Sequence, residues 1–283
     1  MAREDPHSAL ERALREWAGG DLPGEPPRRW ERFSDVAILP PGSFPGPEWV
    51  PDEALWRAIA GALGAERLAR MGEVSGEFRE SGVEMLLGED DWAVRRENGV
   101  DYGYRMTKCM FSAGNVNERR RMGEAPGDGE VVVDLYSGIG YYTLPILVHS
   151  GASLVHACEW NPEAVMSLGW GLEANSVEDR CVVHVGDNRV TTRSLKGVAD
   201  RVLLGLLPSS EDGYEAAIRV LNPAGGTLHL HGLAPSNGHG GWAYEAEGVI
   251  SGMWPGSKVR SNLTRVKSYA PHWDHVVLDV TLA

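Results

Sequence analysis

Apolar and polar positions alternate in blocks along the second half of the chain. Short, continuous apolar runs predict strands, and the amphipathic stretches between them predict helices. The predicted strands are residues 131–135, 154–158, 181–185, 201–206 and 226–231, and the predicted helices are 141–150, 162–175 and 210–220. Because strands that alternate with helices form parallel sheets covered on both faces, this half predicts an α/β, doubly wound domain.

The end of the chain departs from this alternation. Residues 259–269 and 275–282 read as two strands joined by a short turn at Ala270 and Pro271. A connection this short joins antiparallel neighbours. We therefore expect a C-terminal β-hairpin, with one strand antiparallel to the rest of the sheet.

The first half is less regular. Leu10, Leu14 and Trp17 share one face of a predicted N-terminal helix, and prolines and glycines interrupt the following segment, apart from a short strand at Val36–Leu39. A helix is predicted over residues 52–71, with Asp52 as its cap. Further strands are predicted at 83–87, 92–95 and 102–106. These elements predict a small α+β domain.

The pattern divides the chain into three parts. Residues 1–29 form an N-terminal helix and a segment rich in proline and glycine, and residues 30–122 form the small α+β domain with a connector. The segment GEAPGDGE at 123–130 reads as a linker into the doubly wound domain at 123–283.

Composition narrows the function classes. Apolar residues make up 42% and charged residues 24% of the chain, as in globular proteins, and no apolar run is long enough to span a membrane. Cys109, Cys158 and Cys181 are too few and too scattered for a disulfide framework or a zinc site. We therefore expect a cytoplasmic protein with no metal, no membrane association and no obligate protein partner.

Charge is unevenly distributed. The net charge of −13 argues against indiscriminate binding to nucleic acid, which depends on neutralising phosphates. Residues 105–121 nevertheless carry five basic side chains against one acidic one, and residues 251–283 carry four against two. The candidate RNA-binding residues in these segments are Arg105, Lys108, Arg120, Arg121, Lys258, Arg260, Arg265 and Lys267.

The strongest chemical signal is the segment DLYSGIG, which begins at Asp134 and ends the first strand of the larger domain. Gly138 and Gly140 allow the backbone to pass close to a ligand at the start of the next helix. A dinucleotide fingerprint would place a third glycine where Thr143 stands. The turn and the final hairpin therefore favour a Rossmann-like, S-adenosylmethionine-dependent transferase over a nicotinamide enzyme, and an ordinary strand-to-helix turn is the alternative.

The next two strands also end in polar residues. Glu159 stands where an acidic side chain binds ribose hydroxyls in nucleoside-binding sheets. Asp187 and Asn188 follow the third strand and offer acceptors and a donor to an adenine ring. The alternatives are a solvated carboxylate at Glu159 and an Asx turn at Asp187.

Histidines form two close sets without a carboxylate cluster at matching spacing. His229 and His231 lie two residues apart in a predicted strand, and His272 and His275 flank the last turn. We interpret them as structural imidazoles rather than metal ligands.

Six longer motifs together resemble the family of tRNA wybutosine-synthesizing protein 2. They are CMFSAGNVNERRRM, VVVDLYSGIGYYTLPILVHSGA, HACEWNPEAV, DRCVVHVGDNR, ADRVLLGLLPSSEDGY and VKSYAPHWDHVVLDV. The resemblance runs from about residue 30 to the C-terminus. It implies transfer of the 3-amino-3-carboxypropyl group of S-adenosylmethionine to C7 of 4-demethylwyosine at position 37, beside the anticodon of phenylalanine tRNA.

The resemblance also implies site residues. The family's contacts to S-adenosylmethionine fall on Ser112, Arg119, Glu159, Asp187 and Asn188. Arg119 stands where the family often has lysine, and we expect this guanidinium to grip the α-carboxylate with two hydrogen bonds. No general base is evident in the sequence.

Two departures bear on the reaction. The related guanine-N1 methyltransferases carry Asn-Leu-Pro after the fourth strand, whereas this chain has GLLPSS at 205–210, which favours aminocarboxypropyl transfer. The glycine-rich segment 234–258 is short beside the insertions of some relatives. Guanine-N1 methyl transfer and a catalytically idle RNA-binding protein are the alternative functions.

Overall fold

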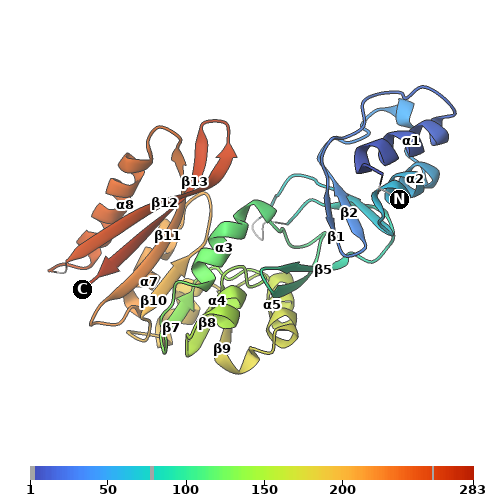
Figure 1. The fold of residues 1–283 in the computed structure, drawn as a ribbon. Helices are drawn as coiled ribbons and strands as arrows, with labels where there is room; N and C mark the ends of the chain where they lie inside the picture. Colours follow the sequence, from blue (N-terminus) through green and yellow to red (C-terminus); the bar gives the residue numbers. More distant parts are fainter. Residues whose placement is uncertain (1–3, 77–79, 257) are drawn as a thin grey trace. The chain divides into compact units, whose positions relative to one another are not determined.

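The computed structural model describes residues 4–76, 80–256 and 258–283. The chain divides into two compact units, shown as ribbons in Figure 1. The first unit contains the chain up to residue 95 together with 103–111, and the second contains 96–102 and 112–283.

The first unit packs helices against a four-stranded sheet in the order β1-β2-β3-β4. Its elements are α1 (Pro6–Ala18), β1 (Glu31–Phe33), β2 (Val36–Leu39), the 3₁₀ helix η1 (Pro47–Trp49), α2 (Glu53–Leu63), β3 (Arg67–Arg70) and β4 (Glu84–Leu87). A separate two-stranded sheet pairs β5 (Trp92–Glu97) with β6 (Val100–Arg105), and the residues of this sheet are divided between the two units.

Two details of this unit differ from the sequence pattern. The helix predicted over 52–71 begins as expected, with Asp52 accepting a hydrogen bond from the Leu55 amide, but it ends at Gly64. Gly64 is left-handed (φ 65°), which stops the helix, and Leu68 then lies in β3. The N-terminal helix, assigned to a segment outside the small domain, buries Leu10 and Leu14 in this unit's core.

The second unit is built on a seven-stranded sheet in the order β12-β13-β11-β10-β7-β8-β9. Its strands are β7 (Val131–Asp134), β8 (Leu154–Glu159), β9 (Cys181–Val185), β10 (Arg201–Leu204), β11 (Gly226–Pro235), β12 (Val259–Ala270) and β13 (Trp273–Leu282). Strands β7 to β11 run parallel, and β13 is antiparallel to both β11 and β12. The predicted doubly wound sheet with a C-terminal hairpin is confirmed (Figure 1).

Helices cover this sheet. They are α3 (Val116–Gly123), α4 (Thr143–His149), α5 (Pro162–Ala174), α6 (Asn188–Thr191), α7 (Tyr214–Val220) and α8 (His239–Met253), with 3₁₀ helices η2 (Ala113–Asn115), η3 (Glu178–Arg180), η4 (Thr192–Ser194) and η5 (Glu211–Gly213). The pattern did not predict α8, because four glycines between 240 and 252 lower its helix propensity. Packing of Ala246 and Ile250 into the core holds this helix in place.

The register of the hairpin sets how far along the sheet each of its residues lies, between the amino and the carboxyl ends of the parallel strands. Lys267 pairs with His275, which pairs with Leu233 near the carboxyl end of β11. Arg260 pairs with Thr281, near the opposite end of the same strand. Lys267 and Arg260 therefore lie toward opposite ends of β12.

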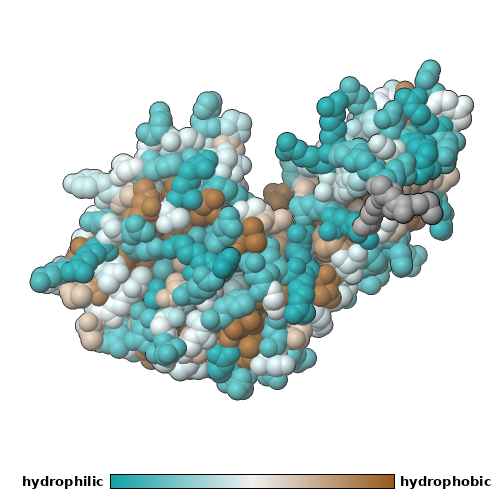
Figure 2. Space-filling model, viewed as in Figure 1, coloured by the Kyte–Doolittle hydropathy of each residue, from teal (hydrophilic) through white to brown (hydrophobic). Residues whose placement is uncertain are grey.

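Hydrophilic residues cover most of the face drawn in Figure 2, and apolar residues gather there only in small groups. In the described part of the chain, every helix is too short or too polar to cross a membrane.

Candidate functional site

The glycine loop between β7 and α4 is built around a buried carboxylate. Asp134 accepts hydrogen bonds from the Thr143 hydroxyl (2.9 Å) and the Tyr136 amide (3.3 Å). Gly138 and Gly140 have φ angles of 55° and 97°, which glycine adopts without strain. Thr143, which replaces the third glycine of a dinucleotide fingerprint, thus fixes the loop to the strand. Burial, with a smaller contribution from Glu159, raises the pKa of Asp134 to about 6.

Glu159 closes the loop from β8. One carboxylate oxygen accepts from the Gly138 amide (2.7 Å), and the other accepts from the amides of Trp160 (2.9 Å) and Asn161 (2.8 Å). Burial raises the pKa of Glu159, while these three backbone donors oppose the rise. The half-buried carboxylate is therefore an ordered part of the loop, not a solvated side chain, and the oxygen that accepts from Gly138 keeps one lone pair for a ligand.

The polar pair after β9 has two separate structural roles. Asp187 caps α6 by accepting from the Arg189 amide (2.8 Å), and its carboxylate forms an ion pair with the Arg189 guanidinium (2.7 Å). Asn188 is buried and donates to the Leu135 carbonyl (2.8 Å), which ties α6 to the end of β7. The Asx turn that the sequence left as an alternative is formed at Asp187, and the Asn188 hydrogen bond holds the ends of β7 and β9 together.

Arg119 lies differently from the expectation of a free carboxylate anchor. Its side chain is 2% exposed, and its guanidinium makes two hydrogen bonds to the Glu97 carboxylate (2.6 and 2.7 Å). A third hydrogen bond goes to the Ser112 carbonyl (3.0 Å). Arg119 therefore holds the backbone at Ser112, and its charge is already neutralised by Glu97.

The histidines of β11 and β13 are buried, as expected for structural imidazoles. His229 donates to Asp279 (2.6 Å) and accepts from Arg201 (2.7 Å). His231 and His275 contact each other through ring nitrogens 3.0 Å apart, and burial lowers the pKa of each to about 3. Among the described residues, one nitrogen of each of these two rings finds no hydrogen-bond partner.

Within residues 4–76, 80–256 and 258–283, the structure brings no three histidine, cysteine, aspartate or glutamate side chains into a group suited to a metal ion.

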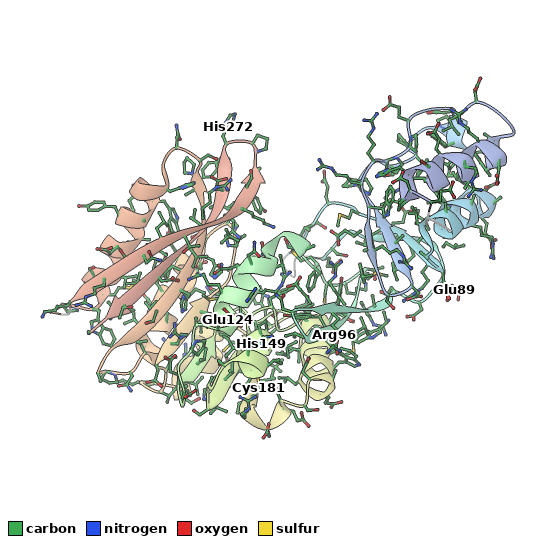
Figure 3. All side chains as sticks on the ribbon, in the orientation of Figure 1. Glu89, Arg96, Glu124, His149, Cys181 and His272 are labelled. Atoms are coloured by element: carbon green, nitrogen blue, oxygen red, sulfur yellow. The ribbon has the colours of Figure 1, made fainter. Side chains whose placement is uncertain are left out.

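The candidate RNA-binding residues are divided between the two units. Arg105 pairs with Asp91 and, with the exposed Lys108, belongs to the first unit. In the second unit, the exposed Arg120 pairs with Glu124, which is labelled in Figure 3. Lys258 and Arg260 are exposed near the amino end of β11, away from the glycine loop.

The remaining basic candidates lie nearer the glycine loop. Arg121 is bound by Glu118 and Asp279, and Arg265 pairs with Asp274. Lys267 donates to the Ser112 hydroxyl (2.6 Å) instead of pointing into solvent. Sequence reasoning missed both this contact and Glu97, because they join segments far apart in the chain.

The sheet topology, the glycine loop and the polar strand ends define the fold of the α/β S-adenosylmethionine-dependent transferases. Residues 93–238 match the family model of the TRM5/TYW2 methyltransferase domain, and residues 10–91 match that of the TYW2 N-terminal domain. The chain belongs to the TYW2 family, the wybutosine-synthesizing protein 2 homologues, as the sequence motifs predicted.

Individual relatives agree with this assignment. The human tRNA wybutosine-synthesizing protein 2 homolog is 38% identical over 320 residues, which cover 92% of this chain and 70% of that protein. The Arabidopsis thaliana tRNA wybutosine-synthesizing protein 2/3/4 is 45% identical over 269 residues, covering 92% of this chain. The chain spans only 27% of the length of this plant relative.

Solved structures show the same fold. TYW2 of Pyrococcus horikoshii in complex with MeSAdo has a TM-score of 0.82 and 31% identity, and the match covers 98% of each chain. TYW2 of Methanocaldococcus jannaschii in complex with AdoMet has a TM-score of 0.71 and 25% identity, covering 90% of this chain and 99% of that one.

Proposed function

We propose that this chain transfers the 3-amino-3-carboxypropyl group of S-adenosylmethionine to C7 of 4-demethylwyosine at position 37 of phenylalanine tRNA. The match of residues 10–91 to the TYW2 N-terminal domain carries this proposal. The model that matches the transferase domain is common to TRM5 and TYW2, so that domain alone does not distinguish the two activities. The relatives are named for wybutosine synthesis, and two TYW2 structures contain AdoMet or MeSAdo.

The residues of the site fit the nucleoside half of S-adenosylmethionine. Gly138 and Gly140 present backbone without side chains, and Glu159 offers its remaining acceptor lone pair and its negative charge to the ribose hydroxyls. Asp187 retains a partly exposed carboxylate at the neighbouring strand end, where it accepts from an adenine amino group. These residues hold and orient the nucleoside.

Bound S-adenosylmethionine supplies a Cγ that is activated by the positive sulfur. The C7–Cγ bond forms as the Cγ–S bond breaks, the sulfur keeps the electron pair as a thioether, and C7 loses a proton. The protein's part is orientation, because the Cγ and not the less hindered methyl group must face the nucleophile. The residues at 205–210, which lack the asparagine of the methyltransferases, are consistent with this choice.

Position-specific labels test the proposal. The protein is incubated with hypomodified phenylalanine tRNA and S-adenosylmethionine labelled either in its carboxyl group or in its methyl group. We expect the carboxyl label, and not the methyl label, to enter the tRNA. Incorporation of the methyl label alone would establish a methyltransferase, and incorporation of neither would establish an idle RNA-binding protein.

A further inference from the structure

The turn between β12 and β13, marked by His272 in Figure 3, carries two exposed aromatic side chains. Tyr269 is 48% exposed and Trp273 is 44% exposed. In the part of the chain that the structure describes, the contacts between aromatic rings include neither of these two rings. Tyrosine and tryptophan are enriched in surfaces that bind a partner, because each offers a large apolar ring with a polar group.

The register of the hairpin places the two rings close together. Ala270 pairs with Trp273 across the turn, and Ser268 pairs with Asp274. Tyr269 is the extra residue between these two pairs, so it lies in a β-bulge next to the turn. Both rings therefore leave the hairpin within one residue pair of each other.

Hydrogen bonds hold the turn in place. Asp274 is 3% exposed and accepts two hydrogen bonds from the Arg265 guanidinium (both 2.9 Å) and one from the His239 ring (2.9 Å). The Ser236 amide donates to the His272 carbonyl (2.9 Å), which ties the turn to the segment between β11 and α8. The two rings are thus presented on an ordered support, which lowers the entropic cost of binding a partner.

The turn lies at the end of the sheet that carries the glycine loop. Trp273 pairs with Pro235, the last residue of β11. Trp273 also shares a sheet face with His275, two residues later. His275 contacts His231, which lies 3.5 Å from Tyr142 after the glycine loop. Strand β13 is three strand spacings from β7, which at about 4.8 Å each is roughly 14 Å across the sheet.

The segments around the turn are poor in acidic residues. The chain has 40 aspartates and glutamates, but none within residues 216–244 or 248–273, which contain β11 and β12. Asp274 is the acidic residue next to the turn, and Arg265 and His239 both pair with it. RNA phosphates therefore meet little repulsion at this turn, although the whole chain has a net charge of −13.

Exposed aromatic rings on a surface without repelling carboxylates fit single-stranded RNA, whose unpaired bases stack on such rings. We propose that Tyr269 and Trp273 form a stacking platform for unpaired bases of the tRNA anticodon loop beside position 37. This inference rests on the proposed function, which brings position 37 to the same end of the sheet. The platform holds the neighbouring bases while the target base faces the cofactor.

The test measures tRNA binding to the full chain by filter binding. It compares hypomodified phenylalanine tRNA with the same tRNA carrying an abasic nucleotide on each side of position 37. We expect the double variant Tyr269→Ala, Trp273→Ala to bind the intact tRNA about tenfold more weakly or worse. Its affinity for the abasic tRNA should stay within about twofold of that of the unaltered protein, because the bases that would stack are absent.

Two further proteins control for the ring and for the loss of an exposed aromatic side chain. The double variant Tyr269→Phe, Trp273→Phe keeps both rings and should recover most of the loss. Tyr244→Ala removes a tyrosine of α8 that is 81% exposed but lies beside Glu245. This control should leave both tRNA affinities unchanged.

Three outcomes would overturn the platform. They are no loss for the intact tRNA, an equal loss for the intact and the abasic tRNA, and a change of oligomeric state on gel filtration. The last would make the turn a contact between copies of the chain. Unchanged methylthioadenosine affinity shows that a variant is folded, and should the double variant fail this check, Trp273→Ala alone gives the same comparison.

Binding is measured without turnover, so this test and the test of the proposed function fail separately. Loss of stacking with incorporation of the methyl label alone would overturn the transfer reaction and leave the platform. Incorporation of the carboxyl label without any loss of tRNA affinity in the double variant would overturn the platform and leave the transfer reaction.

Discussion

Replacing Glu159 by glutamine tests the nucleoside site with a nearly isosteric change. The carboxylate accepts from three backbone amides, two at one oxygen and one at the other. Glutamine retains one acceptor oxygen and places an NH₂ donor at the second position. Either orientation sets a donor against a backbone amide, and the negative charge offered to the ribose hydroxyls is lost.

The expected loss follows from these contacts. A hydrogen bond to a charged group contributes about 1.5–3 kcal/mol, and each 1.4 kcal/mol is about a factor of ten in affinity. Losing the charge that accepts from a ribose hydroxyl should therefore weaken binding of methylthioadenosine at least about tenfold. Calorimetry at pH 7.5 measures this directly, and methylthioadenosine isolates the nucleoside half because it lacks the amino-acid chain of S-adenosylmethionine.

A pH series separates the charge from the loop geometry. Burial raises the pKa of Glu159 above its usual 4.5, and we expect the ligand to prefer the ionised form. Affinity should fall as pH is lowered through this raised pKa, and the fall should be absent in Glu159→Gln. Unchanged affinity in the variant at pH 7.5, or the same pH profile in both proteins, would refute the assignment of Glu159 to the ribose.

Three further predictions address stability and tRNA binding. Burial raises the pKa of Asp134 from 3.8 to about 6, worth about 3 kcal/mol, and the folded state keeps this proton where the unfolded chain has lost it. The free energy of unfolding should thus fall as pH rises from about 4 to about 6, and Asp134→Asn should flatten this dependence in urea titrations; an unchanged slope would contradict the buried carboxylate. Asp279→Ala should lower the free energy of unfolding by about 3–5 kcal/mol, because Arg121 and His229 lose a shared partner, whereas a change below about 1 kcal/mol would contradict this network. Arg265→Gln should reduce the slope of log tRNA affinity against log salt by about 0.9. Arg260→Gln, toward the opposite end of β12, should leave this slope unchanged. Equal effects of the two variants would show that the two ends of β12 do not differ in tRNA binding.

Much of the larger domain follows from the sequence because its signals are local. The apolar run at 131–134 and the glycines after it specify a strand and a tight loop through neighbouring residues alone. Glu159 and Asp187 were expected at one edge because parallel strands place their carboxyl ends together. In these cases a nearby pattern and a general rule of topology were sufficient.

The rest depends on contacts between distant segments. Arg119 reads as a free cation in the sequence, but its partner Glu97 lies 22 residues earlier in a different element. Lys267 reads as a surface lysine in the sequence, but in the structure it donates to the Ser112 hydroxyl. This contact depends on the register shift between Arg265 and Lys267 and on the close approach of Lys267 to Gly114, which only the folded chain shows. Helix α8 was missed because tertiary packing, not local propensity, holds a glycine-rich segment helical.

The identity of the small-molecule product tests the central claim most directly. Incubation of the protein with S-adenosylmethionine and hypomodified phenylalanine tRNA, followed by chromatography, reveals which carbon left the sulfur. Aminocarboxypropyl transfer predicts methylthioadenosine in an amount equal to the modified tRNA. S-adenosylhomocysteine as the sole product would contradict the account and identify the protein as a methyltransferase.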